Sequence, residues 1–286
     1  MSGSDDVDLA GDLTAAEREE VTRDVAEQAR QRTVAAAIGY EATVRATRMA
    51  ADTGIDVPHV PVLPSRTRWG WRQALRFAVE RRMYSREYLL LYTRFLAKRL
   101  ANPHVDIHGV VFLGRRVELK ARRGHGRLSL GPWCWIGDDN KLRAHEGNLR
   151  LGPKVVMGRD NVVNTYLDIE IGQNALLADW VYVCDFDHRY DRLDLPIKSQ
   201  GLVKAPTRIG ADVWVGEKAS ILRGADIGSG SVIASQALVK DVVPPFSIVV
   251  GTPGRVIGSR LPKGMTVEEG LALQRAGHPI PSDPLA

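Results

Sequence analysis

The stretch "IGADVWVGEKASILRGADIGSGSVIASQALV", residues 209–239, repeats one short pattern along its whole length. An aliphatic residue returns at every sixth position, and the residue four places after it is small or β-branched. The aliphatic positions are Ile209, Val215, Ile221, Ile227, Ile233 and Val239. Such a unit supplies a short strand and a turn, and stacked units bury a continuous core that no single unit forms alone. The pattern therefore predicts a mainly β solenoid.

The same spacing appears upstream of this stretch. It runs through Leu130, Ile136 and Leu142, then Leu151, Met157 and Val163, then Ile171, Leu177 and Val183. Short breaks at residues 148–150 and 169–170 follow blocks of three units. We therefore assign residues 103–259 to one β domain, followed by a C-terminal tail over residues 260–286.

Length and composition are those of an ordinary globular protein. The chain has 286 residues, of which 44% are hydrophobic. It has no apolar run of about 20 residues, the length that spans a membrane. The start, "MSGSDDVDLAGDLT", lacks the basic and then apolar order of a signal peptide. With only Cys134 and Cys184, a disulfide framework is not expected, and these features together favour a cytoplasmic protein.

The N-terminal third has a helical pattern instead. Residues 1–60 form an acidic helical segment, from Thr14 to about Ala51, with a Pro-rich linker after it. Residues 61–102 are densely basic, and one helix is expected from about Trp71 to the "ANPH" that follows Leu100. The apolar stripe that this helix should bury consists of Leu75, Val79, Tyr88, Leu89, Tyr92 and Leu96. Its basic side chains either cover apolar surface with their stems or meet an anionic membrane, an acidic polymer or a phosphate.

A longer interruption of the repeat falls in "VYVCDFDHRYDRLD", residues 181–194. Asp187 stands where other units have a small residue, and a carboxylate there is costly unless it has a task or the coil opens. His188 follows, and the spacing resumes only at Ile209, so a loop excursion is expected over residues 188–206. An imidazole at this place is either a general base, effective at neutral pH, or a solvated loop residue.

The segment "IGSGSVIASQALVKDVVPPFSIVVGTPGRVIG", residues 227–258, is very similar to the C-terminal signature of the hexapeptide-repeat acyltransferases. Residues 110–258 as a whole resemble this family, in particular its sugar- and xenobiotic-modifying O-acetyltransferases. The resemblance implies a left-handed parallel β-helix with three units per coil, against the usual right-handed crossover. It also implies a homotrimer with each active site between two subunits, and acyl transfer from acyl-coenzyme A to a hydroxyl or an amine.

The resemblance implies roles for the residues of the interruption. His188 matches the base, which in this family lies just before a loop that leaves the coil. Its second nitrogen would be held by Asp185, Asp187 or a backbone carbonyl. Cys184 is expected to pack in the coil, although a Cys and a nearby His can also form a nucleophile pair.

Other positions match the family's binding residues. Asn164 and Trp214 match acceptor-binding positions, and a hydrogen-bonded asparagine ladder and an interface tryptophan are the structural alternatives. An oxyanion donor is expected near Gly216 or Glu217. The positions that match coenzyme A contacts are Gly216, Ala234, Ser235, Lys240, Gly251 and Arg255.

The expected function is transfer of an acetyl or other short acyl group from acyl-coenzyme A to a hydroxyl of a sugar, saccharide or glycolipid, without a metal. The acceptor and the acyl chain stay open. An amine of an antibiotic or amino sugar is one alternative acceptor, and a non-catalytic β-helix scaffold is the alternative function. A zinc lyase on this fold needs three suitably placed His, and His125, His145 and His188 lack close spacing.

Two kinds of partner follow from the basic segment. Nucleic-acid binding is not expected, because no recognisable stacking module accompanies the positive charge. Peripheral contact of residues 71–100 with the inner face of a membrane, where glycolipid acceptors are made, is an alternative to a helix whose basic side chains only cover its own apolar surface.

Overall fold

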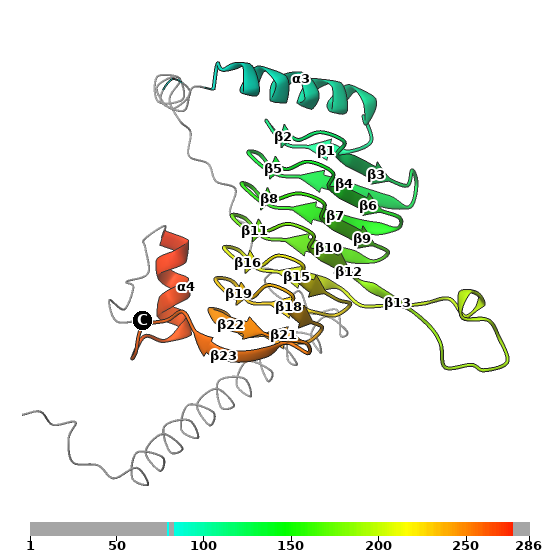
Figure 1. Ribbon diagram of the computed structural model, residues 1–286, viewed down its shortest axis with the longest axis vertical. Coiled ribbons are helices and arrows are strands. Elements are labelled where there is room, and N and C mark those ends of the chain that lie inside the picture. The colour runs from blue at the N-terminus through cyan, green and yellow to red at the C-terminus, as the bar shows by residue number, and fades with distance from the viewer. Residues whose placement is uncertain (1–78, 80–82, 277–286) are drawn as a thin grey trace, which may run out of the picture. The chain divides into compact units, whose positions relative to one another are not determined.

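The computed structural model describes residue 79 and residues 83–276. The helical segment expected between Thr14 and Ala51, and the linker after it, lie outside the described residues. In the described part, short strands pass through three sheets in a fixed rotation, so each coil contributes one strand to each sheet (Figure 1). The strands of successive coils pair in parallel.

The three sheets, here A, B and C, have these strands. Sheet A contains β1 (Asp106–Ile107), β4 (Gly126–Leu130), β7 (Gly147–Leu151), β10 (Asp168–Ile171), β15 (Thr207–Ile209), β18 (Asp226–Ile227) and β21 (Val242–Val243). Sheet B contains β2 (Phe112–Leu113), β5 (Trp135–Ile136), β8 (Val156–Met157), β11 (Leu176–Leu177), β16 (Trp214–Val215), β19 (Val232–Ile233), β22 (Ser247–Val250) and β23 (Arg255–Ser259). Sheet C contains β3 (Glu118–Ala121), β6 (Lys141–Ala144), β9 (Val162–Thr165), β12 (Tyr182–Cys184), β17 (Ser220–Ile221) and β20 (Leu238–Val239).

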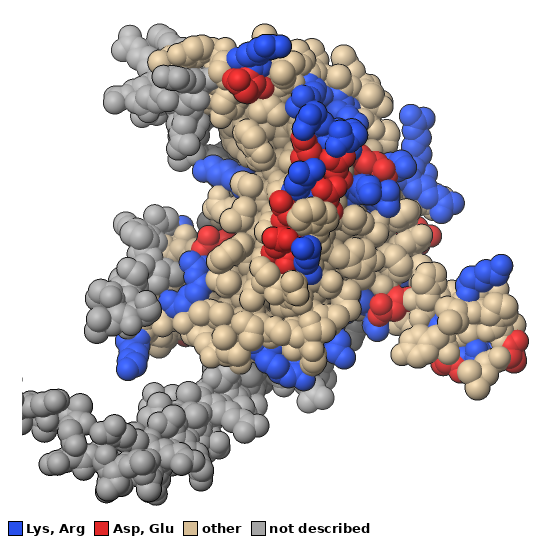
Figure 2. All heavy atoms as spheres, viewed as in Figure 1, with Lys and Arg blue, Asp and Glu red and all other residues tan. Residues whose placement is uncertain are grey.

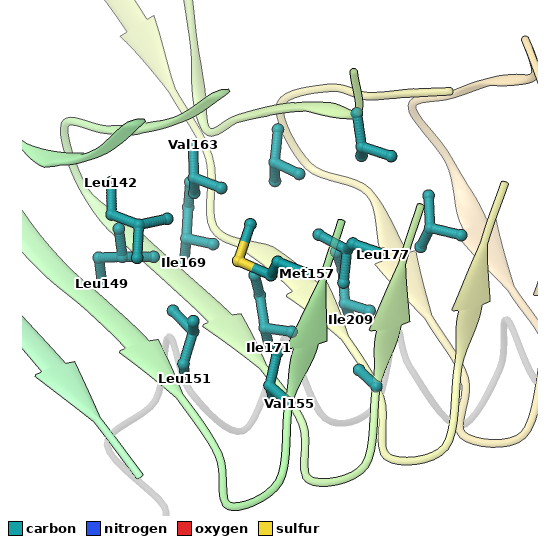
Figure 3. Close-up of a cluster of buried hydrophobic side chains, with 14 of the residues drawn as sticks. Leu142, Leu149, Leu151, Val155, Met157, Val163, Ile169, Ile171, Leu177 and Ile209 are labelled. Atoms are coloured by element: carbon teal, nitrogen blue, oxygen red, sulfur yellow. The ribbon is translucent and has the colours of Figure 1, made fainter. Parts of the chain in front are cut away.

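The repeated aliphatic residues form the core. Leu151, Ile171, Ile209 and Ile227 stack in register along sheet A, and each is at most 3% exposed. Figure 3 shows such side chains pointing into the space that the three sheets enclose. Full burial of an aliphatic side chain stabilises the fold by about 1.5–3 kcal/mol. The stacked aliphatic side chains therefore stabilise coils whose individual strands are too short to be stable alone. The predicted fold class, a mainly β parallel β-helix with a helix on its N-terminal side, is confirmed.

The helix before the first coil is shorter than the sequence pattern indicates. Within the described residues α3 spans Arg86–Ala101, and Met83–Ser85 form a turn and a bend before it. Ser85 takes the N-cap position with an extended backbone, which ends the expectation of one helix from Trp71 to Leu100. The end of α3 agrees with the "ANPH" signal, because the helix stops one residue before Asn102.

The face that α3 buries also differs from the predicted stripe. Tyr88 and Tyr92 pack against Phe112 at the first coil, with ring centroids 5.5 and 5.8 Å away. Leu89 and Leu96, in contrast, are 61% and 56% exposed. Leu89 lies one residue, and thus about 100°, round the helix from Tyr88, and so faces away from the first coil. Beyond Tyr92 the partly buried face continues through Phe95, which packs against the core, and not through Leu96.

A helix that the sequence analysis did not predict lies beside the last coils of the solenoid (Figure 1). Within the predicted tail, α4 spans Val267–Ala276. Thr266 and Glu269 form a reciprocal capping box at its start, with Thr266 N donating to Glu269 Oε2 and Glu269 N donating to Thr266 Oγ1. Gly270 packs on the buried Phe246 ring so closely that a Cβ would lie 2.9 Å from it. The Thr-x-x-Glu spacing of this capping box was present in the sequence and could have predicted the start of α4.

The outer faces of two sheets have opposite character. On sheet A, Arg150 pairs with Asp168 at 2.7 Å and with Glu170 at 3.0 Å, and Arg208 also pairs with Asp168. Figure 2 shows acidic and basic side chains mixed along the middle of this view. On sheet B, the outward residues in register are apolar and exposed: Trp135, Val156, Leu176 and Trp214. We call these four residues the apolar column; a column of this kind is typical of a surface that a partner covers.

Candidate active site

The coil opens at the interruption that the sequence indicated. After Asp185 the chain leaves sheet C as β13 (Phe186–His188), which pairs antiparallel with β14 (Leu202–Lys204), and a short 3₁₀ turn at Ile197–Ser199 lies between them. This excursion, here called the arm, projects away from the stacked coils (Figure 1). Opening of the coil explains why a carboxylate is tolerated at Asp187, since the position is not enclosed there.

His188 is the last residue of β13 and is exposed. Its ring lies at right angles to that of Phe186, with centroids 6.4 Å apart. The imidazole is therefore held on the root of the arm, just outside the coil, where a substrate can reach it. This location is compatible with a general base, which must come within hydrogen-bonding distance of the proton that it removes.

Asp185 has a different task from the one expected. It is fully buried and accepts four hydrogen bonds, from Thr165 Oγ1 and from the backbone amides of Tyr166, Leu167 and Asp168. A buried carboxylate needs such donors to offset its lost hydration. Both of its oxygens thus serve the corner of the preceding coil, and the expectation that Asp185 orients His188 does not match this geometry.

Asp187 also has another partner. Its Oδ2 accepts a hydrogen bond from Arg223 Nε at 2.7 Å, and Arg223 follows β17 in the next coil. This ion pair ties β13, the strand that carries His188, to the next coil. In this structure Asp187 therefore helps to fix the position of the strand.

Asn164 differs from the asparagines that form a ladder in this solenoid. Asn140 and Asn161 make that ladder at the corner between sheets B and C, where Asn161 N and Val181 N donate to their side-chain oxygens. Asn164 instead lies on β9 in register with Cys184. Its Oδ1 is buried without a hydrogen-bond partner among the described residues. Because a buried acceptor normally has a hydrogen-bond partner, this unpaired oxygen favours a ligand-binding role for Asn164 over a place in the ladder.

Two neighbours of Asn164 were not predicted as site residues. Burial, and after it the proximity of Cys184, raise the pKa of Tyr182 to about 12, so its hydroxyl keeps its proton at neutral pH. Burial also raises the pKa of the Cys184 thiol, which donates weakly to Phe186 O at 3.6 Å. A buried, protonated thiol is a poor nucleophile, which favours packing over a nucleophile pair with His188.

Four of the six predicted coenzyme A positions gather at one corner of the solenoid. Gly216, Ala234, Ser235 and Gly251 follow β16, β19 and β22 in three successive coils, where sheet B gives way to sheet C. A Cβ on Gly216 would lie 2.5 Å from Ser235 N, so only glycine allows this close stacking. These four small residues therefore form a narrow strip along the corner, where their own side chains leave the backbone uncovered.

Some backbone donors at this corner are already used. Gly216 N donates to Ile233 O at 2.7 Å, and Ala234 N donates to Val249 O at 2.8 Å. These amides hold the coils together, so of the two predicted oxyanion positions the geometry favours Glu217.

The two predicted basic contacts lie apart from this strip. Lys240 is exposed just after β20, where sheet C gives way to sheet A. Arg255 begins β23, pairs with Val250 in the backbone ladder, and donates from Nη1 to Gly254 O at 3.1 Å. Only Arg255 therefore lies beside β22, the strand that leads into Gly251.

Trp214 lies on a different face from His188. It is 51% exposed on β16 in sheet B, within the apolar column. His188 projects from the corner between sheets C and A, which is opposite sheet B in a three-sided solenoid. Within one chain the structure therefore does not bring these two residues together.

Two other observations bear on the alternatives. In residue 79 and residues 83–276, no group of three or more His, Cys, Asp or Glu side chains is placed to hold a metal ion. None of the helices that the structure describes is both long and apolar enough to cross a membrane.

No family model matches the chain. Among curated proteins, a probable acetyltransferase of Mycobacterium tuberculosis is 51% identical over 187 residues, which is 65% of this chain and 62% of that protein. A putative lipopolysaccharide biosynthesis O-acetyl transferase of Escherichia coli is 30% identical over 33% of this chain and 55% of its own. A chloramphenicol acetyltransferase of Agrobacterium fabrum is 46% identical over 35% of this chain and 51% of its own.

These relatives confirm the resemblance to acetyltransferases that the repeat and its closing segment indicate. The chain spans less than two thirds of the length of each of them. Among solved structures, a mutant N-acyltransferase from Bacillus cereus in complex with dTDP and coenzyme A has a TM-score of 0.49, 18% identity, and covers 63% of this chain and 96% of its own. A hexapeptide-repeat acetyltransferase from Vibrio cholerae in complex with acetyl-coenzyme A has a TM-score of 0.37, 22% identity, and covers 62% and 91%.

Proposed function

We propose that this chain is an acyl-coenzyme A-dependent O-acyltransferase that acetylates a hydroxyl of a sugar, saccharide or glycolipid. The observation that carries the proposal is the position of His188. It is an accessible imidazole on the root of the arm, where a solenoid related to acetyltransferases opens. The named O-acetyltransferase relative of Escherichia coli supports the class of acceptor.

The chemistry needs a base and little else from the protein. A neutral hydroxyl is a poor nucleophile, and an imidazole can remove its proton as the oxygen attacks the thioester carbonyl. The new oxygen–carbon bond forms, the carbon–sulfur bond breaks, and the proton on His188 passes to the leaving thiolate. The negative charge on the carbonyl oxygen would be met by the backbone amide of Glu217.

Coenzyme A would lie along the strip formed by Gly216, Ala234, Ser235 and Gly251. Absence of bulky side chains there lets the pantetheine arm approach the backbone of successive coils. Arg255 beside β22 and the more distant Lys240 are basic groups for the phosphates. No metal takes part in this scheme.

The proposed site is shared between copies of the chain. His188 and Trp214 lie on opposite sides of one solenoid, so they can serve one acceptor only if they come from two subunits. The apolar column supplies a face for such a partner, and the arm ends in exposed apolar residues that include Leu193, which is 99% exposed. A closed ring that repeats this contact is a cyclic oligomer, and the resemblance to the hexapeptide-repeat acyltransferases supports three copies.

We also propose a peripheral membrane contact through α3. Its outward side carries Leu89, Leu96 and Leu100, all exposed, with Arg94 at the flank. Lys98 donates to Val117 O and Arg99 donates to Ile107 O, so these two basic side chains attach α3 to the first coil. The wild type should sediment with anionic vesicles, whereas a Leu96→Asp/Leu100→Asp variant should stay in the supernatant. Equal sedimentation of both proteins would contradict this contact.

Turnover of acyl-coenzyme A tests the proposed function. The chain is incubated with acetyl-, propionyl- or succinyl-coenzyme A and a panel of hydroxylated sugars, amino sugars and chloramphenicol, and released thiol is followed. We expect acceptor-dependent thiol release, with an ester found on the product by mass spectrometry. An amide product would assign an amine acceptor instead, and coenzyme A binding without turnover on any acceptor would point to a scaffold.

A further inference from the structure

The root of the arm, residues 185–188 and 202–205, contacts the coils on both of its sides. Phe186 pairs with Lys204 and His188 pairs with Leu202 across β13 and β14. Ala205 N donates to Asp185 O at 3.0 Å, which closes the root where the chain enters and leaves the coil. His188 is three residues from this closure, so a small rotation of the root would move the imidazole.

On one side, Tyr166 of the preceding coil touches both strands of the root. Its ring meets the edge of the Phe186 ring, with centroids 4.6 Å apart, and Lys204 Nζ lies 5.5 Å above it. The Tyr166 ring also stacks on His145, with centroids 4.8 Å apart and the rings nearly parallel. Lys204 also pairs with Glu146 at 2.5 Å. Edge-to-face ring pairs and cation–π contacts both stabilise the packing of an aromatic ring, so these contacts hold the root against the preceding coil.

The corner that carries Tyr166 is itself fixed from inside. The buried Asp185 carboxylate accepts from Thr165 Oγ1 and from Tyr166 N. One residue later the same chain presents Phe186 to the Tyr166 ring. The start of the arm and Tyr166 are thus joined both through the core and over the surface.

On the other side, Arg223 of the following coil holds Asp187. The contact from Arg223 Nε to Asp187 Oδ2 is 2.7 Å, and both side chains are partly buried. Asp187 is the residue next to His188 on β13. The root is therefore held by an aromatic contact from the coil before and by an ion pair from the coil after.

We propose that Tyr166 and Arg223 are positioning residues that clamp the root of the arm and set the direction in which His188 faces its substrate. Neither residue needs to touch the reacting atoms. Displacement of a catalytic group by about 1 Å can cost on the order of 100-fold in rate, so loss of either half of the clamp should be visible in turnover. The kinetic consequence rests on the proposed function, whereas the clamp itself does not.

Paired substitutions test the clamp. Tyr166→Leu removes the ring contacts on one side of the root and Arg223→Gln removes the ion pair on the other, and we expect each to lower kcat by about 10- to 100-fold with the KM for acyl-coenzyme A unchanged. Tyr166→Phe and Arg223→Lys keep the ring and the charge and should restore most of kcat. The matched control is Arg116→Gln, which breaks an ion pair with Asp139 at a corner without an arm. A rise in acceptor KM alone for Tyr166→Leu would make the ring a binding surface and overturn positioning.

Hydrogen exchange at the Ala205 amide provides a readout that needs no turnover. We expect exchange to be at least about tenfold faster in Tyr166→Leu and Arg223→Gln than in the wild type, because root opening then costs less free energy. Unchanged exchange would overturn the clamp. If the wild type acylates none of the acceptors, the proposed function fails while the exchange measurement still decides the clamp.

Discussion

Asp185 is the side chain on which the corner before the arm most depends. It is buried, and Thr165, Tyr166, Leu167 and Asp168 all donate to it. Asp185→Asn replaces one acceptor oxygen by a donor that faces other donors, so we expect the free energy of unfolding to fall by about 2–4 kcal/mol. Urea denaturation measures this loss.

Asp139→Asn is the control for this substitution. Asp139 pairs with Arg116 at a corner on the surface, and such pairs contribute little to stability because water screens the charges. A loss for Asp185→Asn as small as that of the control would show that the buried carboxylate is not the support inferred here.

The sequence placed Asp185 and Asp187 close to His188 but could not show where their side chains point. Side chains alternate across an extended chain, so Asp185 lies on the same side as the buried Val183, two residues earlier. That alternation was the available signal for its burial. The partner of Asp187 was beyond sequence reasoning, because Arg223 reaches it only through the stacking of the next coil.

At the scale of elements, α3 is attached through one face. Tyr92 packs on Phe112, with centroids 5.8 Å apart, whereas Leu96 is 56% exposed. Tyr92→Ala should therefore lower the free energy of unfolding by about 2 kcal/mol or more, and Leu96→Ala by less than about 0.5 kcal/mol. Thermal and urea unfolding of the two variants check this order, and the reverse order would place the buried face of α3 elsewhere.

The ion pair between β3 and β6 predicts a pH dependence of stability. The Arg143 guanidinium lowers the pKa of Glu118 from 4.5 to about 2 through a hydrogen bond of 2.7 Å. A depressed carboxyl pKa stabilises the folded state above pH 4.5, and this contribution is lost as the pH falls toward 2. The stability difference between the wild type and Glu118→Gln should therefore shrink from pH 5 to pH 2. Parallel stability curves over this range would contradict the pairing.

The elements show what the sequence could determine. The six-residue spacing placed the buried aliphatics from Ile209 to Val239, because the core of a solenoid depends only on nearest neighbours, but it did not reach the buried Val249 of the last coil. The basic helix was drawn too long, since Ser85 can occupy an N-cap or a helix interior and only packing decides. The helix α4 was missed although Thr266 and Glu269 gave its capping signal.

At the scale of the whole molecule, the proposed site requires two copies of the chain. If His188 and Trp214 of different subunits form one site, mixed oligomers of His188→Ala and Trp214→Ala chains should regain activity. Some sites then combine an intact His188 with an intact Trp214, and random mixing makes these about a quarter of the total. Activity of co-purified mixtures, measured against each pure variant, checks the prediction. Activity no higher than the average of the two pure variants would place both residues in one subunit's site.

The sequence identified candidate residues for this site, but it could not show which of them lie together in the fold. Four predicted coenzyme A positions fall at one corner because the repeat keeps equivalent positions in line. Trp214 and His188 were assigned to one site, yet sheet C and a corner separate them within a chain. Spacing along a sequence cannot show which face of a second copy completes a site.

The most direct measurement of the central claim is the rate of acceptor-dependent thiol release by the His188→Ala variant. We expect kcat to fall by about 100- to 10,000-fold, the usual contribution of a general base, with the KM for acyl-coenzyme A retained. His125→Ala, which removes another exposed imidazole of the solenoid, should keep the wild-type rate. A His188→Ala variant that turns over at the wild-type rate would contradict the account.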